Sequence, residues 1–171
     1  KRVKSRLQAK AFHVTLTREK DEFHELEARA REANKLNADL FVSLHFNASS
    51  KSSVSGVETY AFTPIMQPST ARSSLHSSDR KTYPGNANDG WNALAAYYVQ
   101  RSMFKSLKAN DRGLKRARFT VLRDITMPGI LVEGGFVTHA TEGRNIGSAG
   151  YRDRLADAIV EGILVYRKTL N

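Results

Sequence analysis

Residues 39–45, Asp-Leu-Phe-Val-Ser-Leu-His, form a short apolar run ending on a polar side chain, and they predict a buried β-strand. Residues 11–16, Ala-Phe-His-Val-Thr-Leu, predict a second short buried strand upstream. Between them we expect a helix from Asp21, its N-cap, to Asn37, because apolar side chains recur there at helical spacing. These side chains are Phe23, Leu26, Ala30 and Ala33. Strand, helix and strand form a βαβ unit, whose two strands should be parallel.

Further strands and helices follow along the chain. Strands are expected at residues 56–62, 119–123 and 130–133, and helices at residues 91–108 and 151–168. We see no internal repeat and no second domain. The sequence therefore predicts one α/β domain of three layers, in which a mostly parallel, mixed β-sheet is flanked by helices.

The segment 63–90 is the only long loop that the pattern predicts. It is rich in Ser, Pro, Gly and Asn, and it follows the expected third strand. Loops of this length are commonly functional lids or mobile insertions. Two interpretations stay open: the loop borders a binding groove and regulates entry to it, or it only decorates the surface.

The composition excludes several classes of site. The chain has 171 residues, 40% of them hydrophobic and 26% charged, which is ordinary for one soluble domain. Cysteine is absent, so any metal must be held by His, Asp or Glu. No apolar run reaches the roughly 18 residues that a membrane-spanning helix needs, so no transmembrane segment is expected.

The formal net charge of +10 indicates an anionic partner, either nucleic acid, a cell-wall polymer or a lipid headgroup, unless the charges only form solvated faces. Basic residues gather at positions 1–10 and 105–123. These clusters contain few aromatic residues, so stacking on nucleic-acid bases is poorly supported.

Two polar residues end buried strands. His45 closes the strand at residues 39–45, and Glu133 follows Ile-Leu-Val at residues 130–132 and precedes two glycines. Ligands of open α/β sheets bind beyond the carboxyl ends of strands. A carboxylate in such a position is costly to bury unless it is paired, metal-bound or protonated, and glycines leave room for close approach. His45 is a metal ligand or a satisfied strand-end histidine; Glu133 is a functional carboxylate or part of a buried ion pair.

Several other segments accompany these two strands in a fixed order. They are Leu16-Thr17-Arg18 with Asp21, Arg29, Ala33-Asn34, Ala38 to Ala48, Gly56 to Tyr60, Asp111 to Lys115, Val121 to Arg123, and Met127 to Phe136 with Glu142. The ordered set resembles the zinc-dependent N-acetylmuramoyl-L-alanine amidases of bacterial cell separation, spores and phages. The resemblance covers nearly all of the chain outside residues 63–90. Its specificity lies in the order of the pieces, since each alone is weak.

The resemblance implies a reaction and roles for both strand-end residues. The substrate would be peptidoglycan, cut at the amide bond between N-acetylmuramic acid and L-alanine. In the family a zinc ion is held by two histidines and a glutamate. His45 matches the second of these histidines, in a Ser-x-His-x-Asn-Ala segment, and Glu133 matches the catalytic glutamate. Such a glutamate accepts a proton from water and delivers one to the leaving amine.

The family's other two ligands match no segment of these 171 residues. The first histidine belongs to a Gly-His-Gly-Gly loop and the glutamate ligand to the helix after it. We expect the chain to lack the domain's first strand and metal-binding loop, and so to bind metal weakly and be inactive as it stands. His139 stands where the family commonly has asparagine. It is not expected to be a ligand, and neither are the other remaining histidines, which are His13, His24 and His76.

Three other residues are candidates for supporting roles. Asn47 is expected to hydrogen-bond near the metal and substrate or to shape the turn after its strand. Arg123 is expected to bind a substrate carboxylate or to form a surface ion pair. Glu58 is expected to orient a metal ligand, as such sites usually require, or to pair with an arginine.

A peptidoglycan substrate implies that the protein acts in the periplasm or outside the cell. We expect a monomer that binds peptidoglycan and not nucleic acid, and leave open a protein activator. The main alternative is a non-catalytic wall-binding or regulatory module on the same fold. A basic nucleic-acid-binding protein is a weaker alternative, because the chain has the charge but no recognisable motif.

Overall fold

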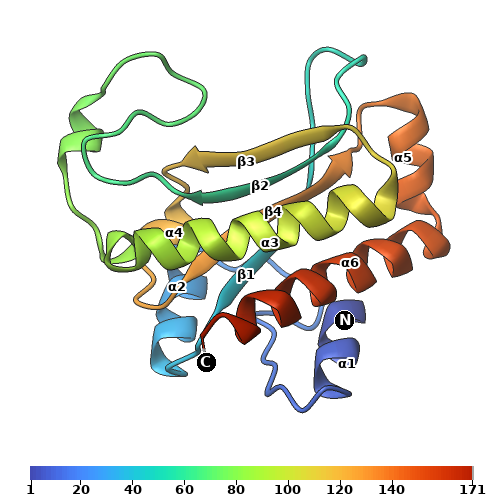
Figure 1. Cartoon of the computed structure of the whole chain (residues 1–171), viewed down its shortest axis with the longest axis horizontal. Helices are drawn as coiled ribbons and strands as arrows, with labels where there is room; N and C mark the ends of the chain where they lie inside the picture. The colour runs from blue at the N-terminus through green and yellow to red at the C-terminus, as the bar shows by residue number, and fades with distance from the viewer. Residues whose placement is uncertain (171) are drawn as a thin grey trace.

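Four strands form one mixed sheet in the order β1-β4-β2-β3 (Figure 1). The computed structural model describes residues 1–170. Strand β4 runs parallel to β1 and antiparallel to β2, while β2 and β3 are parallel. The strands are β1 (Phe41–Asn47), β2 (Val57–Phe62), β3 (Asp111–Ala117) and β4 (Gly129–Phe136). The predicted α/β architecture with a mixed sheet is confirmed.

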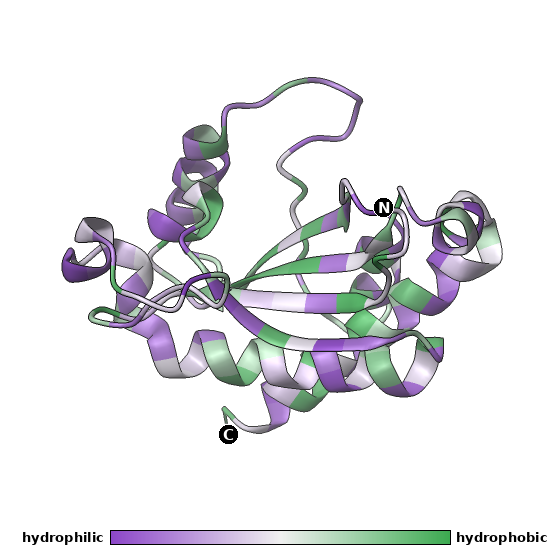
Figure 2. Cartoon of the chain, turned by 90° about the horizontal axis from the view of Figure 1, so that it is seen from above, coloured by the Kyte–Doolittle hydropathy of each residue, from purple (hydrophilic) through white to green (hydrophobic). Residues whose placement is uncertain are grey.

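Helices cover both faces of the sheet, as the view from above shows (Figure 2). The two long helices, α3 (Asp89–Leu107) and α6 (Ala149–Lys168), lie side by side on one face and confirm the helices predicted there. The short helices α2 (Leu26–Lys35) and α4 (Thr120–Arg123) lie on the other. The remaining elements are α1 (Arg2–Gln8), α5 (Ala140–Gly147) and the 3-10 turns η1 (Ser77–Arg80) and η2 (Pro84–Asn88). No helix within residues 1–170 is long and apolar enough to cross a bilayer.

Alternation along the strands separates two cores. Ile130 and Val132 point toward α3 and α6 and belong to the larger core. Leu131 points the other way, into a smaller core with Phe41 and Phe62, which α2 and α4 close. The smaller core covers only part of its face of the sheet. The next residue on that face of β4 is Glu133, which therefore lies beyond the apolar cover.

The strand predicted at residues 11–16 is wrong. These residues form neither strand nor helix, and Phe12 and Val14 pack against the larger core while His13 between them is exposed. The alternation that suggests a strand is thus real. A strand also needs a hydrogen-bonded neighbour, and none pairs with this segment or with the outer edge of β1 within residues 1–170. The predicted parallel pairing in a βαβ unit is wrong for the same reason, and the parallel neighbour of β1 is β4.

The helix predicted from Asp21 begins only at Leu26, with Glu25 as its N-cap. Side chains occupy backbone carbonyls before that point: Arg18 donates to the Glu22 oxygen and Arg29 to the His24 oxygen. A longer helix would have to use those carbonyls in its own ladder. As a result Phe23, expected on the buried face, is 79% exposed.

The strand predicted at residues 119–123 is also wrong, because this stretch forms α4. Its apolar residues fill the smaller core instead of a sheet position. The strand that borders β2 is β3, which the apolar pattern did not predict because four of its seven residues are charged. As an edge strand, β3 tolerates charged side chains well. The predicted strand at residues 130–133 is confirmed within β4.

The long loop after β2 is anchored by a buried carboxylate. Asp79 is fully buried and bonds Arg118 at 2.7 Å and Arg72 at 2.9 Å. Hydrogen bonds from Arg118 and the His76 amide hold the pKa of Asp79 well below its ordinary value. Thr70 also pairs with the main chain of Arg116, so the loop is fastened to the edge of β3.

Gly162 sets the close approach of α6 to α3. A Cβ at this position would lie 2.5 Å from the Val99 Cα and 2.9 Å from the Tyr98 oxygen. We expect Gly162→Ala to lower the free energy of unfolding by about 1–3 kcal/mol, since the obstacle is backbone. Gly150→Ala is the matched control on the same helix, because its nearest neighbour is the flexible Arg154 side chain at 3.7 Å. Urea denaturation of both variants checks this, and equal effects would contradict it.

Candidate active site

Three polar residues stand in a row across the sheet. His45 of β1 is the register partner of Glu133 on β4, and Glu133 is the partner of Glu58 on β2. Residues that face each other on neighbouring strands carry their side chains on the same face. That face is the one opposite α3 and α6, beyond the smaller core. The structure therefore brings His45 and Glu133 together on two parallel strands, in their carboxyl-terminal halves: β1 continues to Asn47 and β4 to Phe136.

His45 is half-buried and neutral at pH 7. Its Nε2 lies 2.8 Å from the Ser43 hydroxyl, and no hydrogen bond within residues 1–170 involves Nδ1. Burial lowers the pKa of His45, and the nearby charges of Arg29 and Arg18 lower it further. A neutral imidazole with one nitrogen held and the other available suits a metal ligand.

Glu133 is half-buried and poorly solvated. Its Oε2 atom is buried and has no hydrogen-bond partner within the described residues. Burial, followed by the charge of Glu58, raises the pKa of Glu133 to about 7. This carboxyl group can therefore both hold and release a proton near neutral pH.

The glycine after Glu133 serves packing. A Cβ on Gly134 would lie 2.5 Å from Leu155 of α6 and 3.1 Å from Phe46. The space that we expected to admit a ligand is filled by these apolar side chains. Gly134 therefore lets α6 press against the back of β4, while Glu133 points to the other face.

Glu58 is 1% exposed and has four hydrogen-bond partners. Oε1 accepts from the Asn47 amide at 2.8 Å and the Tyr60 hydroxyl at 2.7 Å. Oε2 accepts from Arg112 at 2.7 Å and from Lys115. Burial alone would raise the pKa of Glu58, but the bonds from Lys115, Tyr60 and Arg112 hold it below its ordinary value. Glu58 is therefore a buried carboxylate that carries its charge.

Asn47 and Arg123 occupy different ends of the sheet. Asn47 binds Glu58 through its amide nitrogen, and its oxygen accepts from the Ala48 amide at 2.8 Å. It thus shapes the turn after β1 and ties that turn to Glu58. Arg123 lies on α4, ahead of β4, where Asp124 binds its guanidinium at 2.6 and 2.8 Å. Because residues 119–123 are not a strand, Arg123 does not lie at the strand ends beside His45, and the structure shows it in an ion pair.

The other four histidines lie apart from His45. His13 is exposed, and His24 pairs with Glu22 at 3.3 Å. His76 caps η1 and His139 caps α5, each by accepting from a backbone amide. Over residues 1–170 no three His, Asp or Glu side chains are grouped so as to hold a metal ion.

Sequence reasoning missed Arg112, Lys115 and Tyr60 as parts of the site. The signal was present in Arg112 and Lys115, two cations on a short segment that matched the family pattern. Without β3 as a strand, nothing placed these cations beside Glu58.

The family model for N-acetylmuramoyl-L-alanine amidase matches residues 1–165. The chain belongs to the N-acetylmuramoyl-L-alanine amidase family. It is 32% identical over 166 residues to the amidase LytC of Bacillus subtilis, an alignment that covers 97% of this chain. It is 33% identical over 167 residues to the endolysin of Bacillus phage SPP1, covering 95% of this chain.

A solved amidase has the same fold. The N-acetylmuramoyl-L-alanine amidase of Clostridium difficile 630 superposes with a TM-score of 0.82 and 31% identity, over 99% of this chain and 80% of that one. Relative to the full curated proteins, this amidase-family chain spans 29% of LytC and 53% of the phage endolysin.

Glu58→Gln removes the charge that Arg112 and Lys115 neutralise, so we expect it to lower the free energy of unfolding at pH 7 by roughly 3–5 kcal/mol. The folded-state pKa of Glu58 is depressed, so its contribution is present above the unfolded-state pKa. It is lost as the pH falls through the folded-state pKa. Urea denaturation from pH 7 into the acid range should show that the difference in free energy of unfolding between the variant and the wild type becomes smaller. The exposed Glu161→Gln is the control. A gap that stays constant would count against a charged Glu58.

Proposed function

We propose that the protein containing this chain hydrolyses the amide bond between N-acetylmuramic acid and L-alanine in peptidoglycan. The observation that carries the proposal is the pairing of His45 with Glu133 across two adjacent parallel strands, on the open part of one face of the sheet. Family membership supports the same reaction.

Glu133 acts as the proton carrier of this reaction. It accepts a proton from the attacking water and donates one to the leaving amine, which leaves poorly unless protonated. Its buried, unpaired Oε2 and its pKa of about 7 suit both steps. Glu58 stays charged one strand away and, with Asn47, fixes the turn after β1.

His45 fits one ligand position of a zinc site, because it is neutral and Ser43 holds its Nε2. Zinc, when bound, would polarise the amide carbonyl and lower the pKa of water. Catalytic zinc sites use three protein ligands. We propose that the other two come from a strand lying between residues 11–16 and the free edge of β1, with the histidine on the loop after that strand and the glutamate on the helix that follows.

The free edge of β1 exposes apolar side chains that a further strand could cover. Leu44 is 48% exposed and Phe46 38% exposed. A cavity of about 340 Å³ opens beside them, lined in part by His45, Val3 and Arg152. A further strand would cover these apolar side chains and bring its own residues next to His45.

We further propose that the protein acts in the periplasm or outside the cell, where peptidoglycan lies. Its net charge of +10 suits adsorption to anionic envelope polymers. A non-catalytic wall-binding module is the second candidate, and the absence of a three-ligand group within residues 1–170 favours it.

Dye release from labelled peptidoglycan distinguishes the two functions. In the natural protein that contains these residues, Glu133→Gln should reduce the rate by about 10²–10⁴-fold with its zinc content unchanged, because only the proton carrier is lost. A chelator should abolish the wild-type activity, and Glu161→Gln should leave it unchanged. Binding to peptidoglycan without any release would establish the non-catalytic module instead.

The 171-residue chain alone should bind zinc weakly, since it offers His45 as a ligand but no group of three His, Asp or Glu side chains among its described residues. Calorimetric titration should give no tight equimolar binding, and His45→Ala should abolish the weak binding that remains. The matched control is His13→Ala, which removes an exposed histidine elsewhere. Tight binding of one zinc ion per chain would contradict the proposed ligand set.

A further inference from the structure

Arg112 is held in place from two sides. Its Nε donates to Glu58 Oε2 at 2.7 Å, and its guanidinium lies 5.1 Å from the centre of the Phe136 ring. No hydrogen bond within residues 1–170 occupies its two terminal nitrogens, and the side chain is 33% exposed. The guanidinium therefore presents two preoriented donors to the solvent side of the site.

The charges around Glu58 leave a positive surplus. Two cations, Arg112 and Lys115, share one carboxylate oxygen, while two neutral groups, Asn47 and Tyr60, satisfy the other. One cation is enough to neutralise Glu58. Lys115 is the more enclosed of the two, with 20% of its side chain exposed and its ammonium 5.9 Å from the Tyr60 ring centre. The surplus charge thus falls on Arg112.

The position of Arg112 matches a peptide that lies across the strands. The guanidinium reaches back from β3 over β2: its Nε lies 2.7 Å from an oxygen of Glu58, the register partner of Glu133, and its centre lies 5.1 Å from the ring of Phe136 on β4. At about 4.8 Å between neighbouring strands, it is therefore roughly 5 to 8 Å from Glu133. An extended peptide covers about 3.4 Å per residue. A group at Arg112 is therefore about two residues from an amide cut beside Glu133.

We propose that Arg112 binds a free carboxylate of the stem peptide, within about two residues of the amide that is cut. A guanidinium with two free donors matches a carboxylate in a bidentate pair. The sugar side offers no such group, because the carboxyl of muramic acid is itself part of the amide. This inference rests on the proposed function, and it makes Arg112, not Arg123, the residue that selects the peptide.

The test measures binding of a muramoyl peptide to the chain without added metal, by calorimetry or by NMR titration. Two ligands are compared: the peptide with its carboxylates free, and the same peptide with them amidated. For the wild type, amidation should weaken binding about 10- to 100-fold. For Arg112→Gln the two ligands should bind equally, both as weakly as the amidated peptide binds the wild type.

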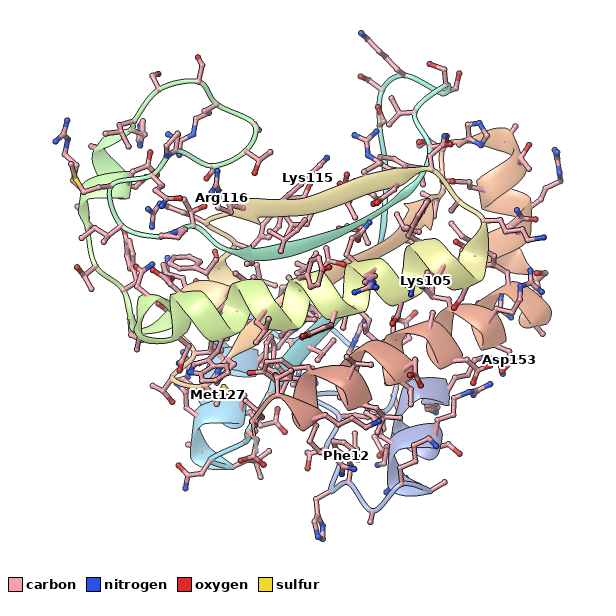
Figure 3. All side chains as sticks on the ribbon, in the orientation of Figure 1. Phe12, Lys105, Lys115, Arg116, Met127 and Asp153 are labelled. Atoms are coloured by element: carbon pink, nitrogen blue, oxygen red, sulfur yellow. The ribbon has the colours of Figure 1, made fainter. Side chains whose placement is uncertain are left out.

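Two further variants distinguish the bidentate geometry of the Arg112 guanidinium from its positive charge. Arg112→Lys keeps a cation beside Glu58 but loses the bidentate geometry, so it should also lose most of the discrimination. Arg116→Gln, four residues along β3 and on the labelled view next to Lys115 (Figure 3), should keep it, because Arg116 pairs with Gln67 instead. Should either Arg112 variant fail to fold, the comparison of the two ligands on the wild type still tests whether the site recognises a free carboxylate.

The outcomes distinguish this inference from the function beneath it. Equal binding of free and amidated peptides to the wild type would overturn the role of Arg112 and leave the amidase proposal standing. No binding of either peptide would remove the proposed substrate, and the inference would fall with it.

Discussion

A fully buried carboxylate in the middle of the sheet organises the polar face of this protein. Burying the charge of Glu58 is tolerable only because every lone pair finds a donor. The donors come from three strands: Asn47 on β1, Tyr60 on β2, and Arg112 with Lys115 on β3. Glu133 on β4 completes the row as the register partner of Glu58. One carboxylate thus ties β1, β2 and β3 together beside Glu133 on β4.

The two faces of the sheet divide the work between packing and chemistry. On the face toward α3 and α6, Val57, Ile130 and Val132 are almost completely buried, and Gly134 and Gly162 allow close contact. This dry layer holds the strands in register. The opposite face is apolar only at the end where α2 and α4 cover it. Since strand residues alternate between faces, the same four strands can carry a rigid core behind and a charged row in front.

The features that depend on strand ends could be predicted from the sequence, and those that depend on strand neighbours could not. His45 and Glu133 each follow an apolar run, so their placement on buried strands follows from local pattern, although both strands continue for two or three residues beyond them. Residues 11–16 have an equally good pattern but no partner strand in the described part of the chain, and pairing is not a local property. β3 shows the opposite error. Its charged residues give no apolar pattern that would predict a strand, but the segment forms one because β2 pairs with it. The misplacement of Arg123 has the same cause. The sequence predicts a strand at residues 119–123, whereas the strand that pairs with β2 begins eight residues earlier, at Asp111.

The electrostatic order of the row explains why its members differ in protonation. Glu58 has two cations within hydrogen-bond distance and stays charged. Glu133 is half-buried, lies beside the charge of Glu58 and has no cation bonded to it, so its pKa rises to about 7. His45 follows on the other side, neutral because of burial and the positive charges of Arg29 and Arg18. Charge therefore changes from cationic on β3, through the anionic Glu58, to the titrating Glu133 on β4 and the neutral His45 on β1. A substrate that carries its negative charge away from the bond to be cut fits this row in one direction only, with its anionic part over β3 and its amide over β4.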